Sequence, residues 1–141
     1  MPTLDPAAAR DRFAAARVAR LATADPAGVP HLVPIVFAVD PGAPGVLYSA
    51  VDGKPKRGPA LRRLANIAAN PRVAVLVDRY DEDWTQLWWA RLDGAARVLA
   101  PGPEWDHGLA LLAGRYPQYV RQPPPGPVLA IDPLRWSGWT G

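Results

Sequence analysis

The strand-like segments of this chain lie close together in sequence, and this spacing constrains the fold more than any other feature. Residues 18–23, VARLAT, and residues 30–40, PHLVPIVFAVD, are separated by Asp25-Pro26-Ala27-Gly28, which is typical of a type I turn. A joint this short suits antiparallel neighbours, because parallel strands need a crossover of a dozen residues or more. Further strands are expected at residues 46–52, 72–79, 86–99 and 128–132, with 86–99 as one long bent strand or a hairpin.

Three helices are expected among these strands. Asp5 caps the first helix and Pro6 suits its first position. The second begins near residues 58–60 and has Leu61, Leu64 and Ile67 at helical spacing, with Arg62 and Arg63 turned away. It stops at Asn70-Pro71, and the third helix fits residues 103–114. Because strands outnumber helices, we predict a mainly β fold: an antiparallel barrel with helices packed outside, in one domain spanning residues 1–141.

Residues 30–40 carry apolar side chains on both faces of their strand. One face has His31, Val33, Ile35, Phe37 and Val39, and the other has Leu32, Pro34, Val36 and Ala38. A strand of this kind is expected to be buried on both sides or to close a barrel. Pro34 donates no backbone hydrogen bond, so an edge, a bulge or a gap is expected at that point.

Composition excludes several classes of protein. The 141 residues are 49% apolar and 21% charged, which is typical of a folded chain. With no cysteine and only two histidines, neither a disulfide framework nor a metal site is expected. Neither Ser49 nor Ser137 lies in the G-x-S-x-G sequence of a hydrolase nucleophile. If the chain is an enzyme, we expect a bound cofactor to supply the chemistry.

No sequence feature predicts a membrane or nucleic-acid partner. No apolar run reaches the roughly 20 residues of a membrane span, and the N-terminal residues do not resemble a secretory signal. We therefore expect a cytoplasmic protein. The net charge of +3 is too mild to indicate nucleic-acid binding, and the aromatic residues do not interleave with the basic loop at residues 53–59.

The segment from Ser49 to Arg63 is the best candidate for a binding site. Its basic residues are Lys54, Lys56, Arg57, Arg62 and Arg63, and the two lysines are the only ones in the chain. Glycines in the loop allow close backbone approach, and the start of the second helix adds a partly positive end. Such groups suit a phosphate or carboxylate. The alternative interpretation is a solvated basic loop.

Two further candidates are largely apolar. A flat ring system could lie against residues 34–36, with its polar edge bonded to backbone amides left free where the strand pairing breaks. The alternative there is ordinary core packing. Tryptophans stand at positions 84, 88, 89, 136 and 139. They suit a dimer interface or a flat aromatic substrate, or they fill the core and its rim.

Three long segments carry a family resemblance: RLATADPAGVPHLVPIVFAVD, VLYSAVDGKPKRGPALRRLANIAANPRVAVLVD and DWTQLWWARLDGAARVL. Together they resemble the split β-barrel flavin- and deazaflavin-dependent oxidoreductases, which are often named for pyridoxamine-phosphate oxidase. The resemblance covers about residues 10–139. The middle segment, followed by the acidic turn and LWW, resembles the actinobacterial branch that uses coenzyme F420.

The resemblance implies a homodimer with cofactor sites between the subunits. The cofactor phosphate would be bound by Lys54, Lys56 and Arg57, with Ser49 nearby. The isoalloxazine-like ring would be flanked by Pro34, Ile35 and Val36, and Trp88 would lie near the ring or the partner subunit. Arg62 and Arg63 would meet the acidic tail of F420 or face water. No second phosphate site is recognisable near the C-terminus, which argues against pyridoxamine-phosphate oxidation.

The function implied by the resemblance is F420-dependent oxidoreduction, in which a hydride passes between the reduced deazaflavin and an electron-poor small-molecule acceptor. One alternative is an FMN-binding oxidoreductase of the same fold, since FMN also needs cationic groups for its phosphate and a flat site for its ring. Another is a non-catalytic protein that binds a cofactor or a tetrapyrrole. The sequence assigns no catalytic side chain, no metal ligand and no particular acceptor.

Overall fold

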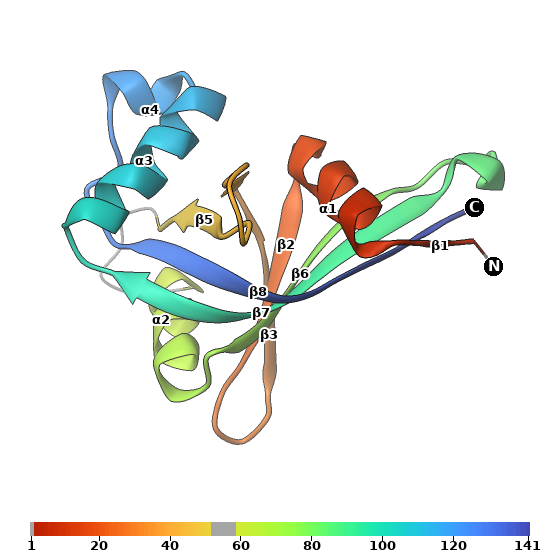
Figure 1. Ribbon diagram of the computed structural model, residues 1–141. Helices are drawn as coiled ribbons and strands as arrows, with labels where there is room; N and C mark the ends of the chain where they lie inside the picture. The colour runs from red at the N-terminus through yellow and green to blue at the C-terminus, as the bar shows by residue number, and fades with distance from the viewer. Residues whose placement is uncertain (1, 52–58) are drawn as a thin grey trace.

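The computed structural model describes residues 2–51 and 59–141, which form a twisted antiparallel sheet flanked by helices (Figure 1). The strands are β1 (Thr3–Leu4), β2 (Ala19–Ala24), β3 (Pro30–Ile35), β4 (Ala38–Val39), β5 (Leu47–Ala50), β6 (Arg72–Arg79), β7 (Trp88–Leu99) and β8 (Val128–Thr140). Their order in the sheet is β3-β2-β6-β7-β8-β5-β4, and β1 pairs with β8. This is the mainly β half-barrel with outer helices that the short joints predict.

The helices are α1 (Pro6–Ala15), α2 (Pro59–Ala69), α3 (Pro103–Arg115) and α4 (Gln118–Arg121), with a 3-10 turn, η1, at Trp84–Gln86. The carboxylate of Asp5 accepts a hydrogen bond from the Ala8 amide at 2.8 Å, so the expected cap of α1 is confirmed. Figure 1 shows α3 and α4 beside β5, at the opposite end of the sheet from the two chain ends. β1 and α4 were not predicted from the sequence.

The long strands β7 and β8 pair along their whole length and form the middle of the sheet. The pairing runs from Trp88 opposite Thr140 to Leu99 opposite Val128. The alternative of a hairpin within residues 86–99 is therefore wrong. The register instead shifts at Gly94, where a β-bulge gives β8 one extra residue.

Two apolar clusters lie on opposite faces of this sheet. The inner cluster includes Phe13 from α1, Ile67 from α2 and buried residues of β2, β6, β7 and β8. The second lies under α3, where Leu112 packs with side chains of β5 and β8 that include Tyr48. Helices α1 and α2 therefore cover the face of the inner cluster, and α3 covers part of the opposite face.

The strand expected at residues 30–40 is divided into β3 and β4. Pro34 lies on β3, which is an edge strand of the described sheet, so the expected edge is confirmed. Burial on both sides is wrong for β3, because Leu32 is 65% exposed and Pro34 is exposed too. Within residues 2–51 and 59–141, no helix covers the outward sides of β3, β2 and β6, because α1 and α2 contribute their buried residues to the inner cluster.

None of the helices in the described part of the chain is long and apolar enough to cross a membrane.

Candidate functional site

The break between β3 and β4 lies beside the end of β5. The hydroxyl of Ser49, which is fully buried on β5, donates a hydrogen bond of 2.7 Å to the carbonyl of Val36. Val36 lies between the two short strands and is half-buried. Two residues that the sequence analysis placed in different parts of the site are therefore in direct contact.

The C-terminal end of α3 fixes the next residue of the break. The Tyr116 hydroxyl lies 3.1 Å from both the amide and the carbonyl of Phe37. The Arg115 guanidinium donates to the Phe37 carbonyl at 3.2 Å and lies 4.7 Å from the centre of the Phe37 ring. It also donates to the carbonyls of Ala14, in the last turn of α1, and of Ala16, just after it. We call Ser49, Arg115 and Tyr116 the break clamp, because they hold backbone around Val36 and Phe37.

The predicted ring contacts differ in their exposure. Pro34 is exposed, Val36 is half-buried and Ile35 is only 8% exposed, with its side chain in the inner cluster. A flat ring at this edge would therefore meet Pro34 and the Val36 backbone rather than the Ile35 side chain. Ser49 already donates its hydroxyl to Val36, so its position suits support of the break rather than direct binding of a phosphate.

The remaining predicted residues are not brought together by the described structure. Lys54, Lys56 and Arg57 lie outside the described residues. Ser49 pairs with Leu129 near the start of β8, whereas Trp88 pairs with Thr140 at its end. Trp88 packs against the inner cluster and has the Arg12 guanidinium 5.4 Å from its ring centre. Within one chain, Trp88 is thus remote from the break.

The two arginines of α2 have different environments. Arg62 is exposed, as the sequence analysis expects. Arg63 is half-buried, and burial lowers the pKa of its guanidinium. The Nε atom of Arg63 is shielded from water and has no hydrogen-bond partner among the described residues. The expectation that both arginines turn away from the core is therefore wrong for Arg63.

A polar network joins α3 to strands β5, β7 and β8. Arg97 forms bonds of 2.7–3.0 Å to the carboxylates of Glu104 and Asp132, and these bonds raise its pKa. The hydrogen bond from Arg97 lowers the pKa of Glu104. Tyr48 donates to Glu104 at 3.0 Å, and burial together with this bond raises the pKa of Tyr48 to about 12. The Tyr48 phenol is therefore a hydrogen-bond donor at neutral pH.

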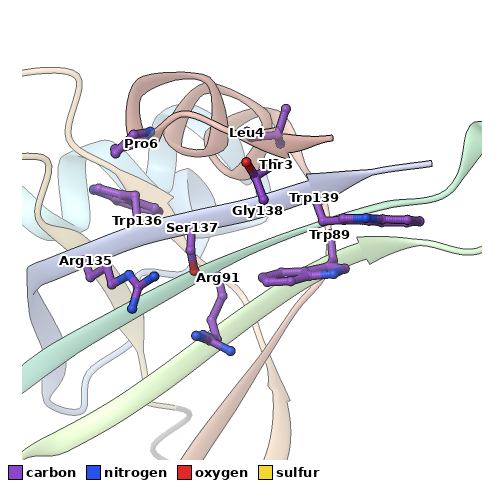
Figure 2. Close-up of a pocket in the computed structure, with 10 residues that line it drawn as sticks. All are labelled: Thr3, Leu4, Pro6, Trp89, Arg91, Arg135, Trp136, Ser137, Gly138 and Trp139. Atoms are coloured by element: carbon purple, nitrogen blue, oxygen red, sulfur yellow. The ribbon is translucent and has the colours of Figure 1, made fainter. Parts of the chain in front are cut away.

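A pocket of about 430 Å³ lies where β1 and the start of α1 meet β7 and β8 (Figure 2). Its lining residues are Thr3, Leu4, Pro6, Trp89, Arg91, Arg135, Trp136, Ser137, Gly138 and Trp139. We call it the N-terminal pocket. Its tryptophans were candidates from the sequence, but Arg91 and Arg135 were not, because their approach depends on the pairing of two distant strands.

Comparison with known proteins identifies the relatives of this fold. The sequence profile described as "Pyridoxamine 5'-phosphate oxidase" matches residues 5–140. No curated protein matches the sequence.

Three solved structures illustrate the likeness. The conserved hypothetical protein Rv2991 of Mycobacterium tuberculosis is 20% identical with a TM-score of 0.76, over 97% of this chain and 85% of that one. A FAD-binding protein of Mesorhizobium loti is 24% identical with a TM-score of 0.71, over 97% and 93%. HutZ, the heme storage protein of Vibrio cholerae, is 16% identical with a TM-score of 0.68, over 94% and 89%. Likenesses at these identities establish the fold alone.

Proposed function

Because the chain belongs to the pyridoxamine 5'-phosphate oxidase family, we propose that it is a cofactor-dependent oxidoreductase that uses F420. The substrate is an electron-poor small molecule that exchanges a hydride with the deazaflavin. The sequence from 49 to 63 favours F420 through its resemblance to the F420-using branch, and its basic residues suit a phosphate and an acidic tail.

The observation that carries the proposal is the 2.7 Å bond between Ser49 and Val36. It joins the end of β5, which leads directly into the basic sequence at 52–58, to the broken strand where a ring could lie. A phosphate-binding loop and a ring-binding edge on adjoining strands would suit a long, flat cofactor with a phosphate side chain. Exposed Pro34 and half-buried Val36 provide an apolar contact for such a ring.

The bound cofactor would supply the hydride chemistry, and the chain would supply binding, orientation and exclusion of water. Pro34 and the Val36 backbone would contact the ring. The break clamp would hold that backbone in place. Lys54, Lys56 and Arg57 would neutralise the phosphate.

A flavin is the alternative cofactor, and the similarity to a FAD-binding protein of the same fold favours it. The loop and ring edge would serve FMN equally well, so these residues alone do not separate the two cofactors. The similarity to a heme storage protein favours a second alternative, a non-catalytic protein that binds a tetrapyrrole. Tight binding without turnover of any acceptor distinguishes that function from an oxidoreductase.

The proposal includes a homodimer with cofactor sites between its subunits. The outward side of β3, β2 and β6 supports this assembly, because it carries Leu32, Ala22 and Leu76 beside the Arg20–Asp78 ion pair, and exposed apolar patches rimmed by polar residues mark interaction sites. Sedimentation at micromolar concentration tests it. We expect a dimer for the wild type and a monomer for Leu32→Glu, while Val120→Glu, at a site of similar exposure on α4, remains dimeric. A monomeric wild type would contradict the assembly.

The cofactor is tested by titrating the purified protein with F420 and FMN in parallel, following cofactor fluorescence. We expect micromolar binding of F420 and weaker binding of FMN. Lys54→Ala and Lys56→Ala should each weaken F420 binding by about tenfold, because each removes one cation from the phosphate. Arg121→Ala changes an exposed arginine of α4 and serves as the matched control.

Each other outcome decides the proposal. Preferential binding of FMN would replace F420 with a flavin. F420 binding that is unchanged in both lysine variants would show that Lys54 and Lys56 do not bind the cofactor phosphate. Failure to bind either cofactor would leave the family membership intact but overturn the proposed function.

A further inference from the structure

The break between β3 and β4 leaves two residues, Val36 and Phe37, outside the regular strand pairing. β3 ends at Ile35 and β4 begins at Ala38, and the two pair with different strands, β2 and β5. The backbone N–H and C=O groups of Val36 and Phe37 therefore need partners other than a neighbouring strand. The source of those partners decides which polar groups of the break remain for a ligand.

One side-chain hydroxyl satisfies both backbone groups of Phe37. The Tyr116 oxygen lies 3.1 Å from the Phe37 nitrogen and 3.1 Å from the Phe37 carbonyl oxygen. A hydroxyl group can accept one hydrogen bond while it donates another, so Tyr116 accepts from the N–H and donates to the C=O. The Arg115 guanidinium gives the same carbonyl a second donor at 3.2 Å. Tyr116 thus provides at Phe37 the bonds that a neighbouring strand would provide.

The end of α3 fixes the position of Tyr116. The Tyr116 amide donates to the Leu112 carbonyl at 2.8 Å, and the Tyr116 carbonyl accepts from the Tyr119 amide at 2.9 Å. Leu112 is fully buried in the cluster under α3. Pro117 follows directly, and proline is common just after the end of a helix. The hydroxyl therefore reaches the break from a fixed helix end, 79 residues from Phe37 in sequence.

These contacts leave one backbone group of the break without a partner. The Val36 carbonyl accepts from the Ser49 hydroxyl at 2.7 Å. The Val36 amide has no acceptor within residues 2–51 and 59–141. Val36 is half-buried and lies two residues after exposed Pro34, on the edge strand. A ligand at this edge therefore meets one unpaired donor, whereas both carbonyls of the break already accept hydrogen bonds.

We propose that Tyr116 is a positioning residue for the cofactor ring and acts through the backbone of the break. Its hydroxyl occupies both polar groups of Phe37 and so holds the Val36 amide as the donor to an acceptor atom at the ring edge. Flavin and deazaflavin rings both carry carbonyl oxygens, so either ring can accept this bond. The inference rests on the proposed function, because it assigns a role within the same cofactor site.

Amide hydrogen exchange, followed by NMR on the full-length protein, tests the arrangement before a cofactor is added. We expect the Phe37 amide to exchange at least about tenfold more slowly than the Val36 amide, because only Phe37 has an acceptor. Tyr116→Phe should speed the exchange at Phe37 by about tenfold, because it removes that acceptor. Unchanged exchange at Phe37 in this variant would overturn the role of the hydroxyl.

The second measurement repeats the exchange with F420 or FMN at saturation, whichever binds in the fluorescence titration. The Val36 amide should then exchange at least about tenfold more slowly, because it has gained an acceptor. Its amide proton resonance should move downfield for the same reason. A Val36 amide that keeps its exchange rate and its resonance position in the saturated protein would overturn the proposal.

Two tyrosine variants separate positioning from a structural role. Tyr116→Phe should weaken cofactor binding about tenfold and leave the Val36 amide less protected in the bound state. Tyr48→Phe is the matched control, because it also removes one hydroxyl under α3, but that hydroxyl donates to Glu104 at 3.0 Å. It should cost similar stability and leave both cofactor affinity and Val36 protection unchanged. Thermal unfolding of each variant checks that the fold is retained.

The variants also supply results that contradict the proposal. An equal loss of affinity in Tyr116→Phe and Tyr48→Phe would reduce Tyr116 to a structural role, and so would wild-type affinity in Tyr116→Phe. Failure to bind either F420 or FMN is a different outcome, which the fluorescence titration of the wild type detects by itself. That failure would overturn the proposed function together with this inference, whereas the affinity and Val36 results arise only while a cofactor binds.

Discussion

At the scale of single residues, Arg115 makes the most far-reaching contacts near the candidate site. Its guanidinium donates to backbone carbonyls on both sides: Ala14 and Ala16 at the C-terminal end of α1, and Phe37 in the break. Nothing in the sequence distinguishes Arg115 from the other arginines of an arginine-rich chain. Its role follows from tertiary contacts that join residues far apart in sequence, and such contacts are not encoded in local spacing.

We expect Arg115→Ala to lower the free energy of unfolding by about 2–3 kcal/mol. The reason is that the change leaves the half-buried carbonyls of Ala14 and Ala16 without the Arg115 donor. Chemical denaturation measures the effect. The control is Arg121→Ala, at an exposed position of α4, which should change stability by less than about 0.5 kcal/mol. Equal stability of the two variants would contradict the structural role of Arg115.

Residue patterns predicted only part of the candidate site. Ser49 and Val36 were singled out from the sequence, but their contact depends on how β5 lies against the break. Arg63 was expected to face water, because helical spacing places it away from the apolar stripe. Its half-burial arises from the surrounding fold, which the spacing does not describe.

At the scale of elements, the sequence predicted β2, β6 and α3 to within one or two residues at each end. Each has a regular apolar period and a clear stop signal. The last strand was predicted as 128–132, but β8 continues to Thr140. The bulge opposite Asp93 and Gly94 breaks the alternation of its side chains, and Pro133 resembles a strand end.

Gly94 allows the bulge between β7 and β8, so Gly94→Ala should destabilise the fold by about 2 kcal/mol or more. A Cβ there would lie 2.6 Å from Ile131 Cγ2 and 2.7 Å from the Asp132 carbonyl oxygen. Thermal and urea unfolding measure the loss.

Gly114 provides the matched control for this substitution. It lies in α3, and a Cβ there meets nothing within 4 Å. Gly114→Ala should therefore stabilise the protein by about 0.5–1 kcal/mol through helix propensity. The two glycine substitutions are expected to act in opposite directions, and a similar effect at both sites would contradict the close contact at Gly94.

At the scale of the whole molecule, the network of Arg97, Glu104 and Tyr48 makes stability depend on pH. The bond from Arg97 holds the pKa of Glu104 below its ordinary 4.5 in the folded state. A carboxyl with a lowered folded pKa adds stability above its unfolded pKa, and that stability is lost as the pH falls through the folded pKa. The affected range therefore begins near pH 4.5 and extends below it.

Glu104→Gln should be less stable than the wild type at pH 7, by up to about 1 kcal/mol, because the groups are partly exposed. The difference should shrink as the pH falls from about 5 to 3. Urea unfolding at a series of pH values measures it. Glu82→Gln, in an exposed turn, is the control and should change stability by less than about 0.5 kcal/mol. A constant penalty for Glu104→Gln would contradict the ionic origin.

The pairing of β8 with β1, β5 and β7 determines when the molecule can fold during synthesis. Until residues 128–140 have left the ribosome, β5 and β7 each lack a neighbour, and β1 has no strand to join. A nascent chain that ends before Val128 exposes unpaired strand edges, which are prone to aggregate. Chaperones that shield extended apolar segments would therefore act mainly in this interval, before the last strand arrives.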